Sequence, residues 1–129
     1  MAKIKLLIDT DIFIDYLNRG FLSSIFEDKG FEIYYSIVTK KGLLSKTGLK
    51  EAERQAILYT LQEYRIIPVD DRIAERYSDL RKIYPSLEKE DALIAATALV
   101  WGLPLVTRNL RHYKIIDGLT LFKGKLDRL

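Results

Sequence analysis

Three polar residues that are far apart in the sequence each stand beside an apolar run. Asp9 follows the run Ile4–Ile8, Asp91 precedes the almost entirely apolar stretch 92–101, and Asn109 comes shortly after Val106. Converging carboxylate and amide oxygens form the ligand set that Mg²⁺ prefers, and the ion keeps several waters. Such an ion polarises a phosphoryl oxygen and lowers the pKa of an attacking water. The spacing therefore fits metal-assisted phosphoryl chemistry.

A second interpretation needs no metal. Asp9 and Asp91 can act as helix caps and Asn109 can be a turn residue, because these residue types are favoured in both places. A carboxylate that leads a nearly apolar stretch, as Asp91 does, is nevertheless hard to explain as solvated surface. Periodicity alone leaves both interpretations open.

The composition limits the chemistry further. The 129 residues include no cysteine and one histidine, His112, but 18 aspartates and glutamates. These counts exclude disulfides, thiolate zinc sites, cysteine nucleophiles and mechanisms that need several imidazoles. Any metal is therefore bound by oxygen, which favours Mg²⁺ or Mn²⁺ over zinc. The net charge of +3 is compatible with a nucleic-acid partner without establishing one.

The length predicts one compact domain over residues 1–129. No apolar run is long enough to span a bilayer, so we expect no membrane association. The first residues, Met1 to Asp9, have too short an apolar stretch and too early an acid for a signal peptide. We therefore expect a cytoplasmic protein.

Apolar runs and helix signals alternate along the chain. Strands are expected over 4–8, 31–38, 65–69, 103–106 and 119–122, and helices over 12–17, 39–46, 50–64, 71–84 and 92–101. This alternation predicts an α/β fold with three layers, α/β/α, around a mainly parallel sheet. Ligands collect outside the carboxyl ends of such strands, so Asp9 and Asn109 should face one crevice.

Four short segments carry a resemblance to a known family. They are LIDTDIFID (7–15), SIVT (36–39), DALIAATA (91–98) and GLPLVTRN (102–109). In this order they resemble the motifs of PIN-domain ribonucleases, and most closely those of VapC toxins from toxin–antitoxin pairs. The resemblance covers essentially the whole chain. It implies an Mg²⁺- or Mn²⁺-dependent endoribonuclease, a homodimer, and a cognate VapB-type antitoxin that inserts a peptide into the active-site groove.

The resemblance also assigns roles to positions in this sequence. Asp9 matches the first acid of the family and Asp91 the third, while Asn109 matches a fourth position that is Asp or Asn. Thr10 and Thr107 fall where hydroxyls support the site. We expect these acids and the amide to bind the metal and activate water. Asp11, two residues after Asp9, could support the site too, although it also fits the start of a helix.

The second acid of the family is missing. The family shows a Glu three residues after the Thr of its second motif, and Gly42 occupies that position after Thr39. We expect Thr39 to be the N-cap of its helix, so that Gly42 lies in the first turn and costs up to ~1 kcal/mol relative to Ala. The chain is either a natural, weakened member or a toxic parent from which the Glu was removed. We favour removal and predict a catalytically impaired protein.

Two other acids could replace the Glu that is missing at position 42. Glu88 and Glu90 flank Asp91 in the first turn of its helix. Both are better explained as charges on a wet surface that interact favourably with the helix dipole.

Basic residues adjoin the same motifs. Lys40 and Lys41 lie in the second motif, and Arg108 and Arg111 flank Asn109. We expect these four side chains to contact RNA phosphates, with Arg108 the strongest candidate. Solvated surface charge is the alternative for each.

Two other functions remain open. Asp9 and Asp11 fit the Asp-x-Asp opening of a haloacid dehalogenase-like phosphatase, in which Asp9 would be the nucleophile. That family's later motifs have no convincing match here. The chain could also be a non-catalytic module that binds RNA and antitoxin, because Gly42 has removed an acid.

Overall fold

A four-stranded parallel sheet forms the centre of the protein. The computed structural model describes residues 3–123. The strands are β1 (Ile4–Ile8), β2 (Phe31–Ser36), β3 (Arg65–Ile67) and β4 (Leu105–Val106). They lie in the order β3-β2-β1-β4, and every pairing is parallel. The apolar run Leu6–Ile8 in the second half of β1 follows from this position, because a central parallel strand is buried on both faces.

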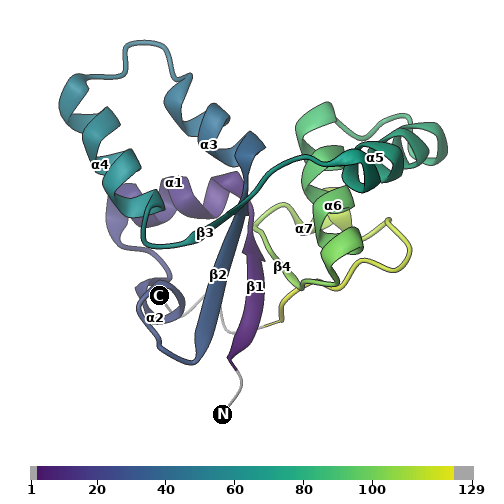
Figure 1. The fold of residues 1–129 in the computed structure, drawn as a ribbon, viewed down its shortest axis with the longest axis horizontal. Helices are drawn as coiled ribbons and strands as arrows, with labels where there is room; N and C mark the ends of the chain where they lie inside the picture. Colours follow the sequence, from purple (N-terminus) through teal and green to yellow (C-terminus); the bar gives the residue numbers. More distant parts are fainter. Residues whose placement is uncertain (1–2, 124–129) are drawn as a thin grey trace.

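Helices cover both faces of the sheet. They are α1 (Thr10–Arg19), α2 (Ser23–Phe26), α3 (Ile37–Leu44), α4 (Glu51–Leu61), α5 (Asp71–Ile83), α6 (Lys89–Trp101) and α7 (Leu110–Tyr113). Figure 1 shows α1 to α4 on one side of the strands and α5 to α7 on the other. The predicted α/β/α architecture with a parallel sheet is confirmed.

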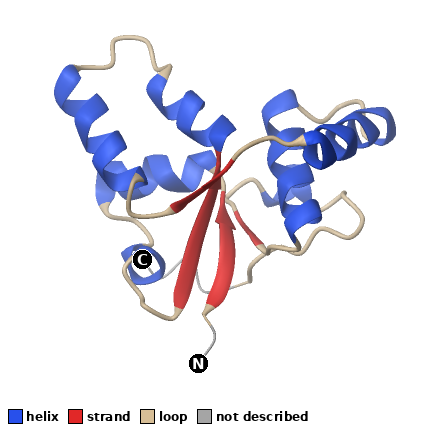
Figure 2. Ribbon diagram, in the orientation of Figure 1, coloured by secondary structure: helices blue, strands red, loops and turns tan. Residues whose placement is uncertain are grey.

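The two faces of β1 supply two separate cores. Leu6 and Ile8 pack with residues of α1, α3 and α4, whereas Leu7 packs with residues of α5, α6 and α7. Adjacent side chains of a strand point to opposite faces, so a run of three apolar residues serves both cores. Figure 2 shows the sheet between the two groups of helices.

The strand order places a topological switch point at β1. The chain passes from β1 to β2 and β3, and then crosses to the other side of β1 to form β4. Loops after β1 and β4 consequently leave in different directions, and ligands bind at such switch points. The backbone amide of Asp9 donates to the carbonyl of Val106 at 2.9 Å, so the two strand ends are joined there.

The boundary between β2 and α3 differs from the prediction. The strand ends at Ser36, not at Val38, and the hydroxyl of Ser36 accepts a hydrogen bond from the Val38 amide as the cap of α3. Thr39 is therefore not the N-cap; it lies inside the helix and is fully buried. Ile37 and Val38 favour strands on their own, and the Ser36 cap overrides that preference. Gly42 accordingly lies in the second helical turn.

Other boundaries move by a few residues. Helix α6 begins at Lys89, so Asp91 lies in its first turn, and Trp101 at its end is 45% exposed. Helices α1, α4 and α5 and strands β3 and β4 are shifted at one or both ends, and α2 and α7 were not predicted. The expected strand 119–122 forms one parallel bridge, between Leu121 and Leu105. Among the residues described, no helix is both long and apolar enough to cross a membrane.

Candidate metal-dependent nuclease site

Asp9 lies at the switch point, where β1 ends and α1 begins. It is the N-cap of α1, and its Oδ1 accepts a hydrogen bond from the Thr10 amide at 2.8 Å. Its Oδ2 accepts from the hydroxyl of Thr107, just beyond β4, at 2.7 Å. The residue is only 3% exposed. The capping interpretation of Asp9 is therefore correct, and it is compatible with a functional one.

Three carboxylates interact at this point. Burial raises the pKa of Asp9 to about 7, and the charges of Asp11 and Asp91 contribute to the increase. Burial likewise raises the pKa of Asp11. Ionised carboxylates in such a place are unfavourable unless a positive charge is present, and perturbed pKa values of this kind are concentrated at functional sites.

Asp11 has an oxygen without a donor. Its Oδ2 accepts from the backbone amide of Arg108 at 3.2 Å. Its Oδ1 is buried and has no hydrogen-bond partner among the residues described. A buried acceptor left unpaired is costly, and a cation with its waters would satisfy it.

The Asp91 carboxylate is contacted by two residues of α7. The hydroxyl of Tyr113 donates to Oδ1 of Asp91 at 3.1 Å, and Nδ1 of His112 lies 3.5 Å from Oδ2. Tyr113 is fully buried, and burial followed by the charges of Asp9 and Asp91 raises its pKa strongly. The role of Tyr113 was not foreseen, because an aromatic residue four positions after Asn109 is typical of a core.

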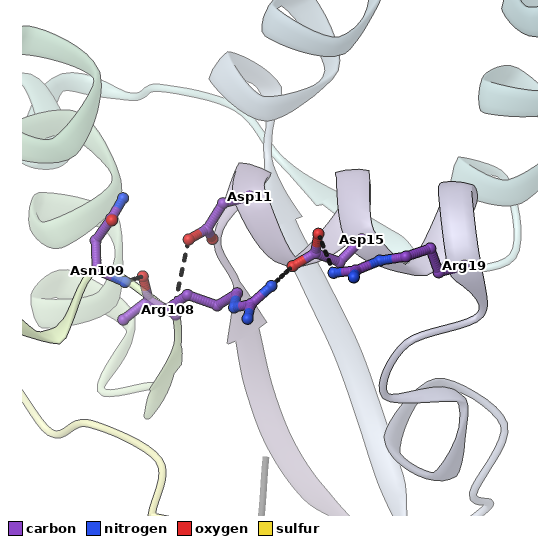
Figure 3. A network of polar contacts seen from close by, with 6 residues as sticks. Asp11, Asp15, Arg19, Arg108 and Asn109 are labelled. Carbon is purple, nitrogen blue, oxygen red and sulfur yellow. Dashed lines mark hydrogen bonds and ion pairs between the residues drawn. The ribbon is translucent and has the colours of Figure 1, made fainter. Parts of the chain in front are cut away.

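Asn109 joins the site through its backbone. It occupies the N-cap position of α7 without a side-chain cap bond, and its amide donates to the Thr107 hydroxyl at 3.0 Å. The same hydroxyl donates to Asp9, so Thr107 links the two. Figure 3 shows Asn109 in the loop after β4, next to Arg108, whose backbone amide donates to Asp11. Its side chain is exposed and available to a ligand.

Position 42 faces the same site from α3. A Cβ atom added to Gly42 would lie 3.6 Å from Oε1 of Glu90 and 3.8 Å from Cγ2 of Thr10. The Thr10 hydroxyl donates to Oε1 of Glu90 at 2.8 Å and lies 2.9 Å from the hydroxyl of Thr39. Glu90 is thus half-buried and bonded, which corrects its placement on a wet surface; Glu88 is exposed, as expected.

The basic residues differ in how far they are already engaged. Arg108 forms an ion pair with Asp15 (Figure 3). Its guanidinium also lies over the ring of Phe21, 4.9 Å from the centroid. Arg111 lines a hollow of about 210 Å³ together with Asp91 and His112. On α3, Lys40 is half-buried and Lys41 is exposed.

The residues present fit an oxygen-bound divalent ion. Two of the three expected ligands are carboxylates within mutual electrostatic range, and Asp11 adds a buried oxygen that lacks a donor. Within residues 3–123, no group of three or more His, Asp or Glu side chains is placed to hold an ion as it stands. Mg²⁺ and Mn²⁺ sites commonly use one or two carboxylates and complete their shell with water.

Comparisons with known proteins agree with this geometry. The PIN domain family matches residues 6–117. The chain is 32% identical to ribonuclease VapC10 of Mycobacterium tuberculosis over 123 residues, 88% of this chain and 90% of that protein. It is 31% identical to ribonuclease VapC1 of Methanocaldococcus jannaschii over 118 residues, covering 85% and 79% of the two chains.

A solved structure shares both fold and sequence. A chain of a toxin–antitoxin complex from Klebsiella pneumoniae superposes with a TM-score of 0.75 at 32% identity, covering 89% of this chain and 95% of that one. The protein therefore belongs to the PIN-domain family, as the four motifs predicted, and the named relatives are VapC proteins. This membership disfavours the phosphatase alternative.

Proposed function

We propose that this chain is an Mg²⁺- or Mn²⁺-dependent endoribonuclease, the toxin of a VapBC-type toxin–antitoxin pair. The observation that carries the proposal is the buried Asp9 carboxylate, held by Thr107 and Thr10 within electrostatic range of Asp11 and Asp91. The ribonuclease relatives support the reaction class.

Each side chain has a defined task in this proposal. Asp9, Asp91 and Asn109 hold the ion, which when bound polarises a phosphoryl oxygen and lowers the pKa of a water. Thr107 keeps the Asp9 carboxylate and the Asn109 backbone in a fixed relation. Tyr113 fixes the Asp91 carboxylate by hydrogen bonding to one of its oxygens. Preorganisation of this kind reduces the cost of assembling the site during catalysis.

The proposed partners follow from the same family. RNA phosphates would contact Lys40, Lys41, Arg108 and Arg111, and a VapB-type antitoxin would block the groove in a homodimeric toxin. The Klebsiella relative is itself part of a toxin–antitoxin complex, which supports the antitoxin. We further propose that the protein acts in the cytoplasm. Light scattering of the purified protein, alone and with its antitoxin, tests the assembly.

The activity is expected to be impaired. Position 42 lies against Thr10 and Glu90 in the site but carries no side chain. Its backbone has none of the positive φ angles that favour glycine, and the nearest atoms leave room for a Cβ at ordinary contact distance. Neither conformation nor crowding therefore requires glycine at this position.

RNA cleavage by purified protein tests the proposal directly. We expect slow cleavage that needs Mn²⁺ or Mg²⁺, is abolished by EDTA and is lost in Asp91→Asn. Asp79→Asn, a change at an exposed acid on α5, is the matched control and should cleave like the parent. Equal cleavage by parent and Asp91→Asn would show that the activity does not come from this site.

The absence of a side chain at position 42 favours a second candidate, a non-catalytic module that binds RNA and antitoxin. The two candidates differ in the response to a restored acid. RNA binding without cleavage, both before and after Gly42→Glu, would support the module.

A further inference from the structure

Helix α3 forms one wall of the site but contributes no acid to it. The side chain that would point from position 42 toward Thr10 is missing, although the position has ordinary helical backbone. The vacant space is bounded by two residues only a few ångströms away, Thr10 and Glu90.

The carboxylate of Glu90 extends into this space. Its Oε1 and Oε2 lie 3.6 and 4.0 Å from where a Cβ on Gly42 would stand. Glu90 precedes Asp91 on α6, and Thr10, which bonds Glu90, follows Asp9 on α1. Glu90 is therefore joined through Thr10 to the start of α1, the helix that Asp9 caps, and its carboxylate lies in the part of the site that faces α3.

A chain of hydroxyls holds Glu90 in this place. Thr10 gives its only hydroxyl proton to Glu90, so the buried Thr39 must donate to Thr10. The chain of donors therefore ends on the Glu90 carboxylate, and a hydrogen bond to a carboxylate is a strong one. Glu88, by contrast, is the N-cap residue of α6; it is exposed and its side chain makes no capping hydrogen bond.

We propose that Glu90 is a carboxylate of the divalent-cation site and supplies from α6 the negative charge that α3 lacks at position 42. The inference rests on the proposed function, because it concerns the same ion. It assigns to Glu90 a task that its sequence position, in a dipole-stabilised first turn, did not indicate.

Mn²⁺ binding measured by titration calorimetry on the intact, RNA-free protein tests the proposal. Glu90→Gln keeps the size of the side chain and an acceptor for Thr10 but removes the charge. We expect it to weaken Mn²⁺ affinity about tenfold or more, the scale of losses around metal centres. The control Glu88→Gln should change affinity less than about twofold. Circular dichroism and urea unfolding in EDTA verify that each variant is folded.

Asp9→Asn separates the two possible failures. If Asp9→Asn binds Mn²⁺ as the parent does, the metal site itself is wrong and the proposed function fails. If Asp9→Asn weakens binding but Glu90→Gln matches Glu88→Gln, the metal site stands and only the role of Glu90 is overturned.

A second measurement uses position 42. In a Gly42→Glu background the acid on α3 is restored, so Glu90→Gln should then cost less than about twofold in Mn²⁺ affinity. The same substitution costs about tenfold in the Gly42 parent if the two acids share a task. An equal cost in both backgrounds would show that Glu90 does not replace a side chain at position 42.

Discussion

The two walls of the site are built in different ways. The acidic wall consists of Asp9, Asp11 and Asp91, carried by the starts of α1 and α6. The glycine wall is the face of α3 around Gly42. On the acidic wall, Asp9 and Asp91 are fixed by donors from neighbouring loops and helices. On the glycine wall the carboxylate comes from another helix. With the role proposed for Glu90, the site keeps a negative charge beside α3 although α3 itself carries no acid there.

The largest effect, on the rate of RNA cleavage, is expected when an acid is introduced at position 42 on the glycine wall. Gly42→Glu should raise metal-dependent RNA cleavage by about 100-fold or more, since a well-placed acid or base contributes on this scale. Initial rates on a fluorescent RNA substrate measure it. Gly42→Gln is the matched control, because it adds the same length and a similar helix propensity without charge. A rate increase of the same size in Gly42→Gln would show that stabilising α3, and not the carboxylate, was responsible.

Sequence patterns could predict the acidic wall because its causes are local. Asp9 ends a buried strand and Asp91 begins an apolar helix, and the parallel sheet brings such ends together. Gly20 and Gly102 likewise end α1 and α6, and Asp70 caps α5, by local chemistry alone. The fold class followed from the same local signals, whereas the family followed from the resemblance of the four motifs.

The glycine wall could not be predicted because its contacts are distant in sequence. Thr10 and Glu90 are 80 positions apart, and only the packing of α1, α3 and α6 places them together. The start of α3 was also misplaced, since Ser36 and Thr39 are both good caps and the β-branched residues between them resemble a strand. Tyr113 looked like an ordinary core residue for the same reason: its partner is not local.

The second prediction concerns Thr107, which lies just beyond β4 and is hydrogen-bonded to Asp9 on the acidic wall. Thr107→Val removes a buried hydroxyl that donates to Asp9 and accepts from the Asn109 amide. We expect a loss of about 3 kcal/mol in unfolding free energy, because a buried charge and an amide each lose a partner. Urea denaturation measures it. Thr97→Val is the control: that hydroxyl is equally buried but bonds only a carbonyl of its own helix, so about 1 kcal/mol or less is expected. Equal losses would contradict the special role of Thr107.

The third prediction concerns the charge on the acidic wall. Asp9→Asn should stabilise the metal-free protein by about 2 kcal/mol. The raised pKa of Asp9, about 7, means that the folded protein disfavours the ionised carboxylate, and Asn removes that charge while its Oδ1 still accepts from the Thr10 amide. Asn has one acceptor oxygen where Asp has two, so the lost hydrogen bond from Thr107 offsets part of this gain. Unfolding at neutral pH in EDTA measures it.

Asp70→Asn provides the matched comparison for this prediction. Asp70 also caps a helix, accepting from the Ile73 amide at 2.9 Å, but it is exposed. No stabilisation is expected there. In saturating Mn²⁺ the parent should have the higher unfolding free energy and Asp9→Asn the lower one, because the ion stabilises only a protein that binds it. Destabilisation by Asp9→Asn in EDTA would mean that its charge is already compensated within the protein.

The smallest effect is expected from the cations of the two walls. Lys41 on the glycine wall is exposed, whereas Arg108 on the acidic wall is paired with Asp15 and lies over Phe21. If Lys41 contacts one RNA phosphate, Lys41→Ala should weaken binding only a few-fold and reduce the slope of log affinity against log salt by about 0.7. Arg108→Ala should lower the slope by no more than this, because its guanidinium is already paired with Asp15. It should leave metal affinity unchanged, because alanine keeps the backbone amide that donates to Asp11. Fluorescence anisotropy in EDTA at several salt concentrations measures the slopes, and Mn²⁺ titration measures the metal affinity. An unchanged slope in Lys41→Ala would show that Lys41 on α3 does not contact an RNA phosphate. The substrate would then be positioned from the acidic wall.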